Sequence, residues 1–114
     1  MDDRDLCYRS LHEVRAMLDS GAVSSLELTE ACLARIAAYD STIHAFLTVT
    51  EDVAREQARA ADARRASGQV LSPLDGIPMS LKDVMLTEGI RTTAGSQMLA
   101  DFVPPYNGTV VDKL

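Results

Sequence analysis

The sequence predicts an α/β fold in which N-terminal helices pack on a mixed β-sheet. Two Ser-x-x-Glu sequences, at residues 10–13 and 24–27, each precede apolar residues at helical spacing, the pattern of a capped helix start. Residues 43–50 and 77–84 are short and rich in β-branched, aromatic or alternating apolar residues, which favours strands. With 114 residues, the chain is expected to form one domain at most.

The first two helices are predicted from their starts, periodicity and stops. One begins at Ser10 and ends at Gly21, whose left-handed conformation terminates helices; the other begins at Ser24 and ends near Tyr39 and Asp40. The apolar face of each helix recurs at helical spacing. These faces are Leu11, Val14, Met17 and Leu18 in the first helix, and Leu28, Cys32, Leu33, Ile36 and Tyr39 in the second.

Two further helices complete the predicted set. Thr50 is expected to cap an alanine-rich helix over residues 51–66, whose arginines alternate with acids at helical spacing and so predict a solvent-facing surface. Thr109 is expected to cap a last helix, which has barely begun when the sequence stops at Leu114. We therefore expect the chain to be a fragment.

Composition excludes several classes of function. The net charge of −6 argues against direct binding of a nucleic-acid backbone, which requires clustered Lys and Arg. The sequence has no apolar run long enough to cross a bilayer, and its charged start does not resemble a secretory signal, so a cytoplasmic location is expected.

The cysteines and histidines do not predict a metal site. Cys7 and Cys32 have only His12 and His44 as companions, and this spacing matches neither zinc nor redox motifs. We expect both cysteines to act as small buried hydrophobes. His12 is predicted on the surface and His44 at the edge of the first strand, neither as a catalyst.

Lys82 is the main candidate for chemistry. Alternation in the predicted strand places it beside Pro78 and Ser80 and opposite Ile77, Met79 and Leu81. Burying an ammonium costs several kcal/mol unless it is paired or gives up its proton. Ser80 shares its face, so a self-contained Ser/Lys pair is one alternative. Asp83 points away and is interpreted as structural, whereas Thr92, Thr93, Gly95 and Ser96 either approach an active site or simply form a loop.

Longer motifs resemble a known family. Residues 74–83 read Leu-Asp-Gly-Ile-Pro-Met-Ser-Leu-Lys-Asp, and they are followed by Gly-Ile-Arg-Thr-Thr-Ala-Gly-Ser at 89–96 and Phe-Val-Pro-Pro-Tyr-Asn-Gly-Thr-Val-Val at 102–111. This pattern closely resembles the amidase signature family, and within it the A subunits of aspartyl/glutamyl-tRNA(Asn/Gln) amidotransferases. Residues 20–30 and 45–50 also resemble the N-terminal region of those subunits.

The resemblance implies a Ser–cis-Ser–Lys hydrolase in which Lys82 matches the catalytic lysine. A nucleophilic serine attacks an amide, a second serine relays its proton, and the neutral lysine is the final base. Both serines of the family lie in a downstream Gly/Ser-rich signature that this sequence lacks. Residues 1–114 are therefore expected to be the N-terminal part of a single amidase signature domain, truncated before that signature, and the resemblance leaves open whether this chain alone is an enzyme.

The resemblance also implies a role in protein biosynthesis. The expected function is glutaminase chemistry that supplies ammonia for the transamidation of Glu-tRNA(Gln) or Asp-tRNA(Asn). Partner subunits B and C would assemble with it, and the partner would use ATP and magnesium and make most of the tRNA contact, so that this chain binds no cofactor. Val84 replaces an Asn common in these subunits, which leaves a stand-alone amidase for a small carboxamide as one alternative. A non-catalytic fragment is another.

Overall fold

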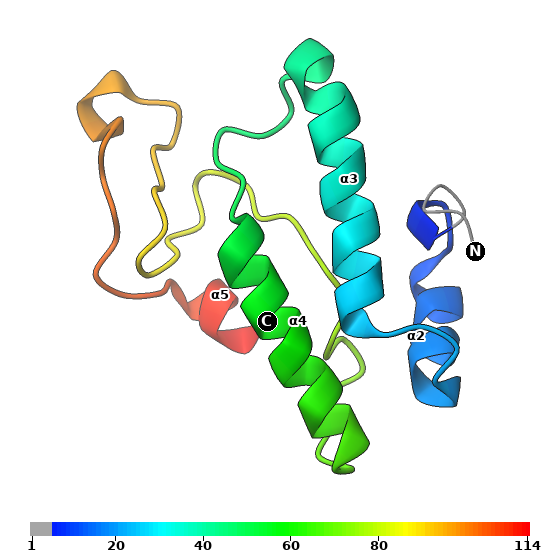
Figure 1. The fold of residues 1–114 in the computed structure, drawn as a ribbon. Coiled ribbons are helices and arrows are strands. Elements are labelled where there is room, and N and C mark those ends of the chain that lie inside the picture. Colours follow the sequence, from blue (N-terminus) through cyan, green and yellow to red (C-terminus); the bar gives the residue numbers. More distant parts are fainter. Residues whose placement is uncertain (1–5) are drawn as a thin grey trace. The chain divides into compact units, whose positions relative to one another are not determined.

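The computed structural model describes residues 6–114, which form two compact units (Figure 1). The N-terminal unit extends to Pro78, and the C-terminal unit comprises Met79–Leu114. The N-terminal unit contains three long helices: α2 (Leu11–Ser20), α3 (Ser25–Ile43) and α4 (Glu51–Ala66). In the part of the chain that is described, no helix combines the length and apolar character needed to cross a bilayer.

Both predicted capping boxes are present. At the start of α2, Glu13 N donates to Ser10 Oγ at 3.3 Å, and Ser10 N donates to the Glu13 carboxylate at 2.8 Å. The same reciprocal bonds join Ser24 and Glu27 at the start of α3. Gly21 ends α2 with a φ of 73°. The sequence therefore predicted both helix starts and the first stop correctly, because these features depend on neighbouring residues alone.

Helix α3 continues one turn beyond its predicted end. It ends at Ile43, where His44 adopts the left-handed conformation with a φ of 55°. The amide of His44 donates to the Asp40 carbonyl at 2.7 Å, and the Asp40 carboxylate accepts from the amide of Ala45 at 2.7 Å. Asp40 thus lies inside the last turn and closes it, instead of marking its end.

Helix α4 has the predicted bounds but lacks the predicted cap. Thr50 makes no side-chain hydrogen bond, and only its carbonyl accepts from Ala54 N at 2.9 Å. The helix runs antiparallel to α3 and packs against it (Figure 1). Its small Ala58 and Ala61 side chains are buried, which allows the two helices to approach closely.

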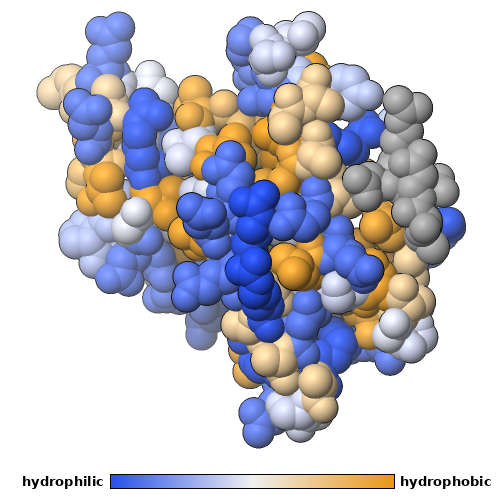
Figure 2. Space-filling model, viewed as in Figure 1, coloured by the Kyte–Doolittle hydropathy of each residue, from blue (hydrophilic) through white to orange (hydrophobic). Residues whose placement is uncertain are grey.

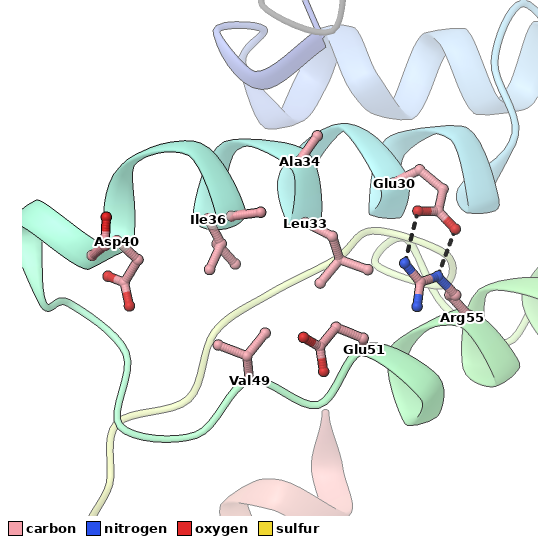
Figure 3. Close-up of a pocket in the computed structure, with 10 residues that line it drawn as sticks. Glu30, Leu33, Ala34, Ile36, Asp40, Val49, Glu51 and Arg55 are labelled. Atoms are coloured by element: carbon pink, nitrogen blue, oxygen red, sulfur yellow. Dashed lines mark hydrogen bonds and ion pairs between the residues drawn. The ribbon is translucent and has the colours of Figure 1, made fainter.

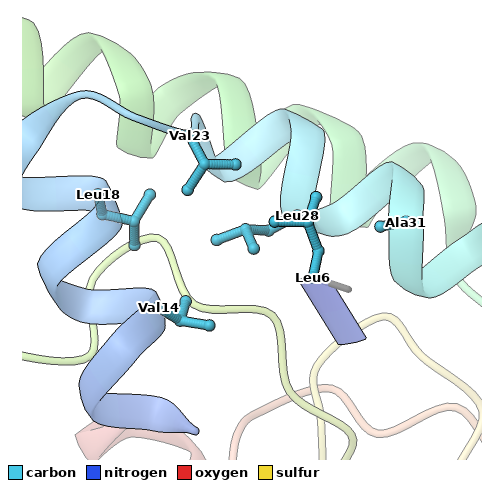
Figure 4. Close-up of a cluster of buried hydrophobic side chains, with 6 residues drawn as sticks. All are labelled: Leu6, Val14, Leu18, Val23, Leu28 and Ala31. Atoms are coloured by element: carbon cyan, nitrogen blue, oxygen red, sulfur yellow. The ribbon is translucent and has the colours of Figure 1, made fainter. Parts of the chain in front are cut away.

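The hydrophobic core of the N-terminal unit lies between α2 and the first half of α3 (Figure 4). Val14 and Leu18 come from α2, Leu28 and Ala31 come from α3, and Leu6 and Val23 lie outside these helices. Leu18 and Ala31 are each only 1% exposed. Burying Leu, Val and Ala side chains here fixes α2 on α3.

The predicted α/β fold is wrong, because residues 6–114 contain no β-strand. Residues 43–50 were expected to form the first strand. Their first residue belongs to α3, and the amides of Ala45 and Phe46 both donate to the Asp40 carboxylate. Donors that are satisfied by a preceding helix cannot build a ladder with a neighbouring strand. His44 is accordingly a helix cap and not a strand-edge residue.

Residues 77–84 also fail to form the predicted strand. Ile77 N donates to the Leu74 carbonyl at 3.0 Å, and the Lys82 carbonyl accepts from Met85 N at 3.0 Å. Both bonds close turns, and no neighbouring strand is paired with this extended segment among the described residues. The alternation of apolar residues was therefore misleading here, because a strand also needs a hydrogen-bonding partner.

The C-terminal unit is mostly irregular. Its only regular elements in the described chain are the short 3₁₀ helix η1 (Gln97–Leu99) and helix α5 (Thr109–Lys113). Residues 86–92 and 102–108 run antiparallel, joined for example by Gly89 N to the Pro104 carbonyl at 3.0 Å. The Pro104 side chain is fully buried. Helix α5 forms where predicted, but Gly108 occupies its N-cap position and the expected Thr109 cap is absent.

Candidate functional site around Lys82

Lys82 lies on an exposed, extended segment of the C-terminal unit. The side chains from Met79 to Lys82 are all solvent-exposed, so the described residues do not bury the lysine. Within residues 6–114, its ammonium group makes no hydrogen bond or ion pair. Ser80 is likewise exposed, and no hydrogen bond joins it to Lys82 in this part of the chain. The self-contained Ser/Lys pair therefore gains no support from the geometry.

Asp83 anchors the segment that carries Lys82. Its carboxylate accepts hydrogen bonds from the backbone amide of Thr93 at 2.8 Å and from the Thr93 hydroxyl. Its backbone carbonyl accepts from Ala94 N at 2.7 Å. These three bonds attach the residue next to Lys82 to a loop ten positions further along the chain, in agreement with the structural interpretation of Asp83. We call this arrangement the Asp83 clamp.

The Asp83 clamp keeps its carboxylate ionised. Hydrogen bonds from the hydroxyl and then the amide of Thr93 hold the pKa of Asp83 below its usual range, and the amide of Gly95 contributes further. A carboxylate that accepts several hydrogen bonds is stabilised in its charged form. The site therefore presents a fixed negative charge at the residue that follows the exposed lysine.

The Thr/Gly/Ser loop is built around its own hydrogen bonds. Thr92 and Thr93 are 5% and 4% exposed, and the Thr93 hydroxyl also accepts from Gly95 N at 3.1 Å. Ala94 adopts the left-handed conformation with a φ of 50°, and its amide donates to the Asp83 carbonyl. The Ser96 hydroxyl accepts from Met98 N and caps η1. Each hydroxyl thus has an internal partner, which accounts for the loop without a ligand.

In the N-terminal unit, Asp75 fixes the loop that leads toward the Lys82 segment. Its carboxylate, with a side chain only 7% exposed, accepts from Arg64 Nε at 3.0 Å and from Arg64 Nη2 at 2.6 Å. It also accepts from Leu71 N, while Arg65 donates to its backbone carbonyl at 3.1 Å. The Arg64 pair holds the pKa of Asp75 below its usual range. This two-bond pairing is the strongest geometry available to an arginine and a carboxylate.

Gly76 brings the same loop against the start of α3. The Ser25 hydroxyl donates to the Gly76 carbonyl at 2.7 Å. Gly76 has a φ of 90°, and a Cβ at this position would approach the Cβ of Ser25 to 3.3 Å. Both the backbone conformation and the close contact therefore require glycine.

Asp62 completes the contacts between α4 and the start of α3. Its two carboxylate oxygens accept from the amides of Ser25 at 2.7 Å and Leu26 at 3.1 Å. The first amides of a helix have no partners within the helix, so this carboxylate, which belongs to α4, acts as an additional cap of α3. The roles of Asp62, Asp75 and Ser25 could not be predicted from the sequence, because their partners lie between 11 and 51 positions away and leave no local pattern. The Asp-Gly pair at 75–76 was the one available signal.

An open groove lies elsewhere in the N-terminal unit, between α3 and the start of α4 (Figure 3). Its volume is about 460 Å³, and Leu33, Ile36 and Val49 supply its apolar lining. Glu30 and Arg55 close one end through two hydrogen bonds of 2.7 and 3.2 Å. The groove contains no nucleophile–base pair. In the described chain, no group of three or more His, Cys, Asp or Glu side chains could hold a metal ion.

Comparison with known proteins gives consistent matches. Residues 27–114 match the Amidase family. The A subunit of the glutamyl-tRNA(Gln) amidotransferase from Chloroflexus aurantiacus is 53% identical over 110 residues, which are 96% of this chain and 23% of the relative. Its counterpart from Geobacter sulfurreducens is 54% identical over 110 residues, or 22% of its length. The chain therefore spans less than a quarter of the relatives it matches.

A solved structure gives the same result for the fold. It comes from work on a vestigial protein complex and the evolutionary origins of an s-triazine catabolic enzyme. It is 36% identical and superimposes with a TM-score of 0.85 over 92% of this chain and 23% of that one. The family match covers Asp75, Gly76, Lys82 and the Asp83 clamp. From Glu27 to Leu114, this chain belongs to the Amidase family.

Proposed function

We propose that this chain is the N-terminal part of the A subunit of a glutamine-hydrolysing amidotransferase, with Lys82 as its general base. The observation that carries the proposal is the position of Lys82: it lies in the Leu-Lys-Asp motif, and its neighbour Asp83 is anchored by the clamp. Identities of 53–54% to amidotransferase A subunits support the choice of reaction.

In the proposed reaction, this chain supplies the base, and polypeptide outside these residues supplies the two serines. Lys82 accepts a proton that begins on a nucleophilic serine and passes through a second serine, and both serines belong to a Gly/Ser-rich segment absent from these residues. Covering Lys82 with apolar polypeptide favours the neutral amine that this step requires. The released ammonia serves the transamidation of Glu-tRNA(Gln) or Asp-tRNA(Asn). Partner subunits B and C supply the ATP- and magnesium-dependent step and most of the tRNA contact.

The surface supports a larger domain around this segment. Apolar residues lie open to solvent among the charged ones (Figure 2). In the C-terminal unit, Met79, Leu81 and Val84 flank Lys82 and are 51%, 37% and 54% exposed. An apolar stretch on both sides of a proposed base is suited to burial by further polypeptide, which would exclude water from the lysine.

A chimeric enzyme tests the proposal. Residues 1–114 replace the matching segment of the Chloroflexus aurantiacus relative, which is assembled with its own partner subunits, and ammonia release from glutamine is measured. Lys82→Ala is expected to lower kcat by at least about 100-fold, the usual contribution of a general base. Lys113→Ala is the matched control, because Lys113 is the only other lysine in the sequence and is also exposed. It is expected to retain activity.

The same assay separates the alternatives. A chimera that cleaves small carboxamides but does not support transamidation would favour a stand-alone amidase. Equal rates for the Lys82→Ala and unmodified chimeras would reject Lys82 as the base. The isolated 114-residue chain is expected to be inactive. If that chain does show turnover, and Lys82→Ala abolishes it, the nucleophile must be a residue within the chain, and Ser80 is the first candidate.

A further inference from the structure

The segment that precedes α2 contacts α3 at two points on either side of Cys7. Leu6 belongs to the buried cluster that includes Leu28 and Ala31 (Figure 4). Tyr8 contacts Arg35: the guanidinium carbon lies 5.0 Å from the centre of the ring, and Arg35 Nη2 donates to the hydroxyl at 3.3 Å. Ala31 and Arg35 lie on either side of position 32 of α3. The two contacts therefore place Cys7 over Cys32.

These flanking contacts bring the two thiols into the same part of the N-terminal unit. Both cysteines are free and half-buried, and Cys7 packs against the buried cluster. Burial, together with the neighbouring Cys7, raises the pKa of the Cys32 thiol to about 11, although Arg35 opposes the shift. They are the only two cysteines in the sequence.

We infer that Cys7 and Cys32 form a reversible disulfide when the chain meets a small-molecule disulfide such as oxidised glutathione, which ties the segment before α2 to α3. The Cys7 thiolate attacks one sulfur of the oxidant and releases a glutathione thiolate. Cys32, as its thiolate, then attacks the Cys7 sulfur and releases the second glutathione. The two cysteines lose two electrons and two protons, and the oxidant becomes two molecules of reduced glutathione.

The assignment of roles follows from the surroundings of each thiol. Cys32 has the raised pKa and is therefore the poorer first nucleophile at neutral pH. It is better placed as the resolving residue, because the contacts of Leu6 and Tyr8 hold Cys7 against the part of α3 that carries Cys32. Contacts made by Leu6 and Tyr8 hold the pair together without the covalent bond, so that bond formation requires little chain ordering.

The experiment equilibrates the 114-residue chain in buffers of reduced and oxidised glutathione, under native conditions and in concentrated urea. Free thiols are then alkylated, and the species are resolved by intact mass. From these, the effective concentration of the thiol pair is calculated. We expect the native value to exceed the value in urea by at least roughly tenfold, because only the folded chain holds the thiols together. By linkage, a tenfold ratio corresponds to about 1.4 kcal/mol of added stability for the oxidised chain.

Two variants and three outcomes decide the inference. Cys7→Ser and Cys32→Ser should each stop at a mixed disulfide with glutathione or remain unmodified, whereas the unmodified chain should lose two hydrogens within one molecule. Equal effective concentrations in native buffer and in urea would overturn the inference. So would a native chain that accumulates only mixed disulfides, or one that forms only dimers linked between molecules.

Discussion

At the scale of single residues, Asp75 is a carboxylate that is almost fully removed from solvent. Its side chain is 7% exposed and receives two bonds from Arg64 and one from a backbone amide. A buried carboxylate is stable only when such donors replace the water it has lost. This single side chain therefore keeps the loop before Pro78 attached to α4.

Replacing Asp75 by Asn is expected to lower the free energy of unfolding at neutral pH by roughly 1–3 kcal/mol, because charge-assisted bonds are lost from a buried position. The folded-state pKa of Asp75 is lowered. Its contribution is therefore present above the unfolded pKa of about 3.9 and disappears as the pH falls through the folded value. Urea unfolding between neutral pH and pH about 3 should show the variant and the parent converging in acid.

Asp52→Asn provides the control for this measurement. Asp52 also contacts an arginine, but the closest approach to Arg55 is 3.8 Å and the Asp52 side chain is fully exposed. An exposed pair of this kind contributes little to stability. A loss in the control as large as that of Asp75→Asn would contradict the importance assigned to the buried pair.

At the scale of elements, the helices differ in whether a side chain accepts a hydrogen bond from the amides of their first turn. The Ser24 hydroxyl accepts from Glu27 N, and the Ser24 amide donates to the Glu27 carboxylate. The Thr50 side chain makes no capping bond. Ser24→Ala is expected to destabilise the chain by about 1 kcal/mol. Thr50→Ala is expected to change stability by less than half of that. Thermal unfolding followed by far-UV circular dichroism measures both, and equal losses would show that the capping bond is not the cause.

Local features of the elements could be predicted from the sequence, and non-local features could not. Ser10, Gly21 and Ser24 determine helix ends through bonds within a few residues, so their patterns are visible in the chain. A strand depends on a partner elsewhere, which is why alternation at 77–84 wrongly predicted a strand in a segment that forms none. Residues 43–50 form no strand, because the Asp40 carboxylate accepts hydrogen bonds from the amides of Ala45 and Phe46.

The candidate site shows the same division. The motif around Lys82 identified the family, and the structural interpretation of Asp83 agrees with its hydrogen bonds to Thr93. Burial of Lys82 depends on surrounding residues that a sequence pattern does not specify, and the lysine is exposed in residues 6–114. Its proposed role as a base stays a prediction.

At the scale of the whole molecule, the division into two units makes a direct prediction. All the contacts of Asp62, Asp75 and Gly76 described above lie within the N-terminal unit. A chain ending at Pro78 should therefore keep the helical signal and the urea midpoint of α2, α3 and α4. A chain ending at Gly68 retains the three helices but loses Asp75 and Gly76, and it should unfold at lower urea. Coincident midpoints for these two truncations would contradict the stabilising role of the loop.

The Asp62 cap has a consequence for how this fold tolerates change. The Asp62 carboxylate of α4 accepts hydrogen bonds from the first amides of α3. These bonds align the two helices at the start of α3, which is the end opposite to the connection between the helices. The length of that connection is thereby uncoupled from helix alignment. Residues inserted after Leu47, beyond the amides held by Asp40, cost only loop entropy, which rises by about 0.6 kcal/mol for each doubling of loop length. This connection is therefore a natural place for insertions, and a suitable point to attach a probe without disturbing the helix pair.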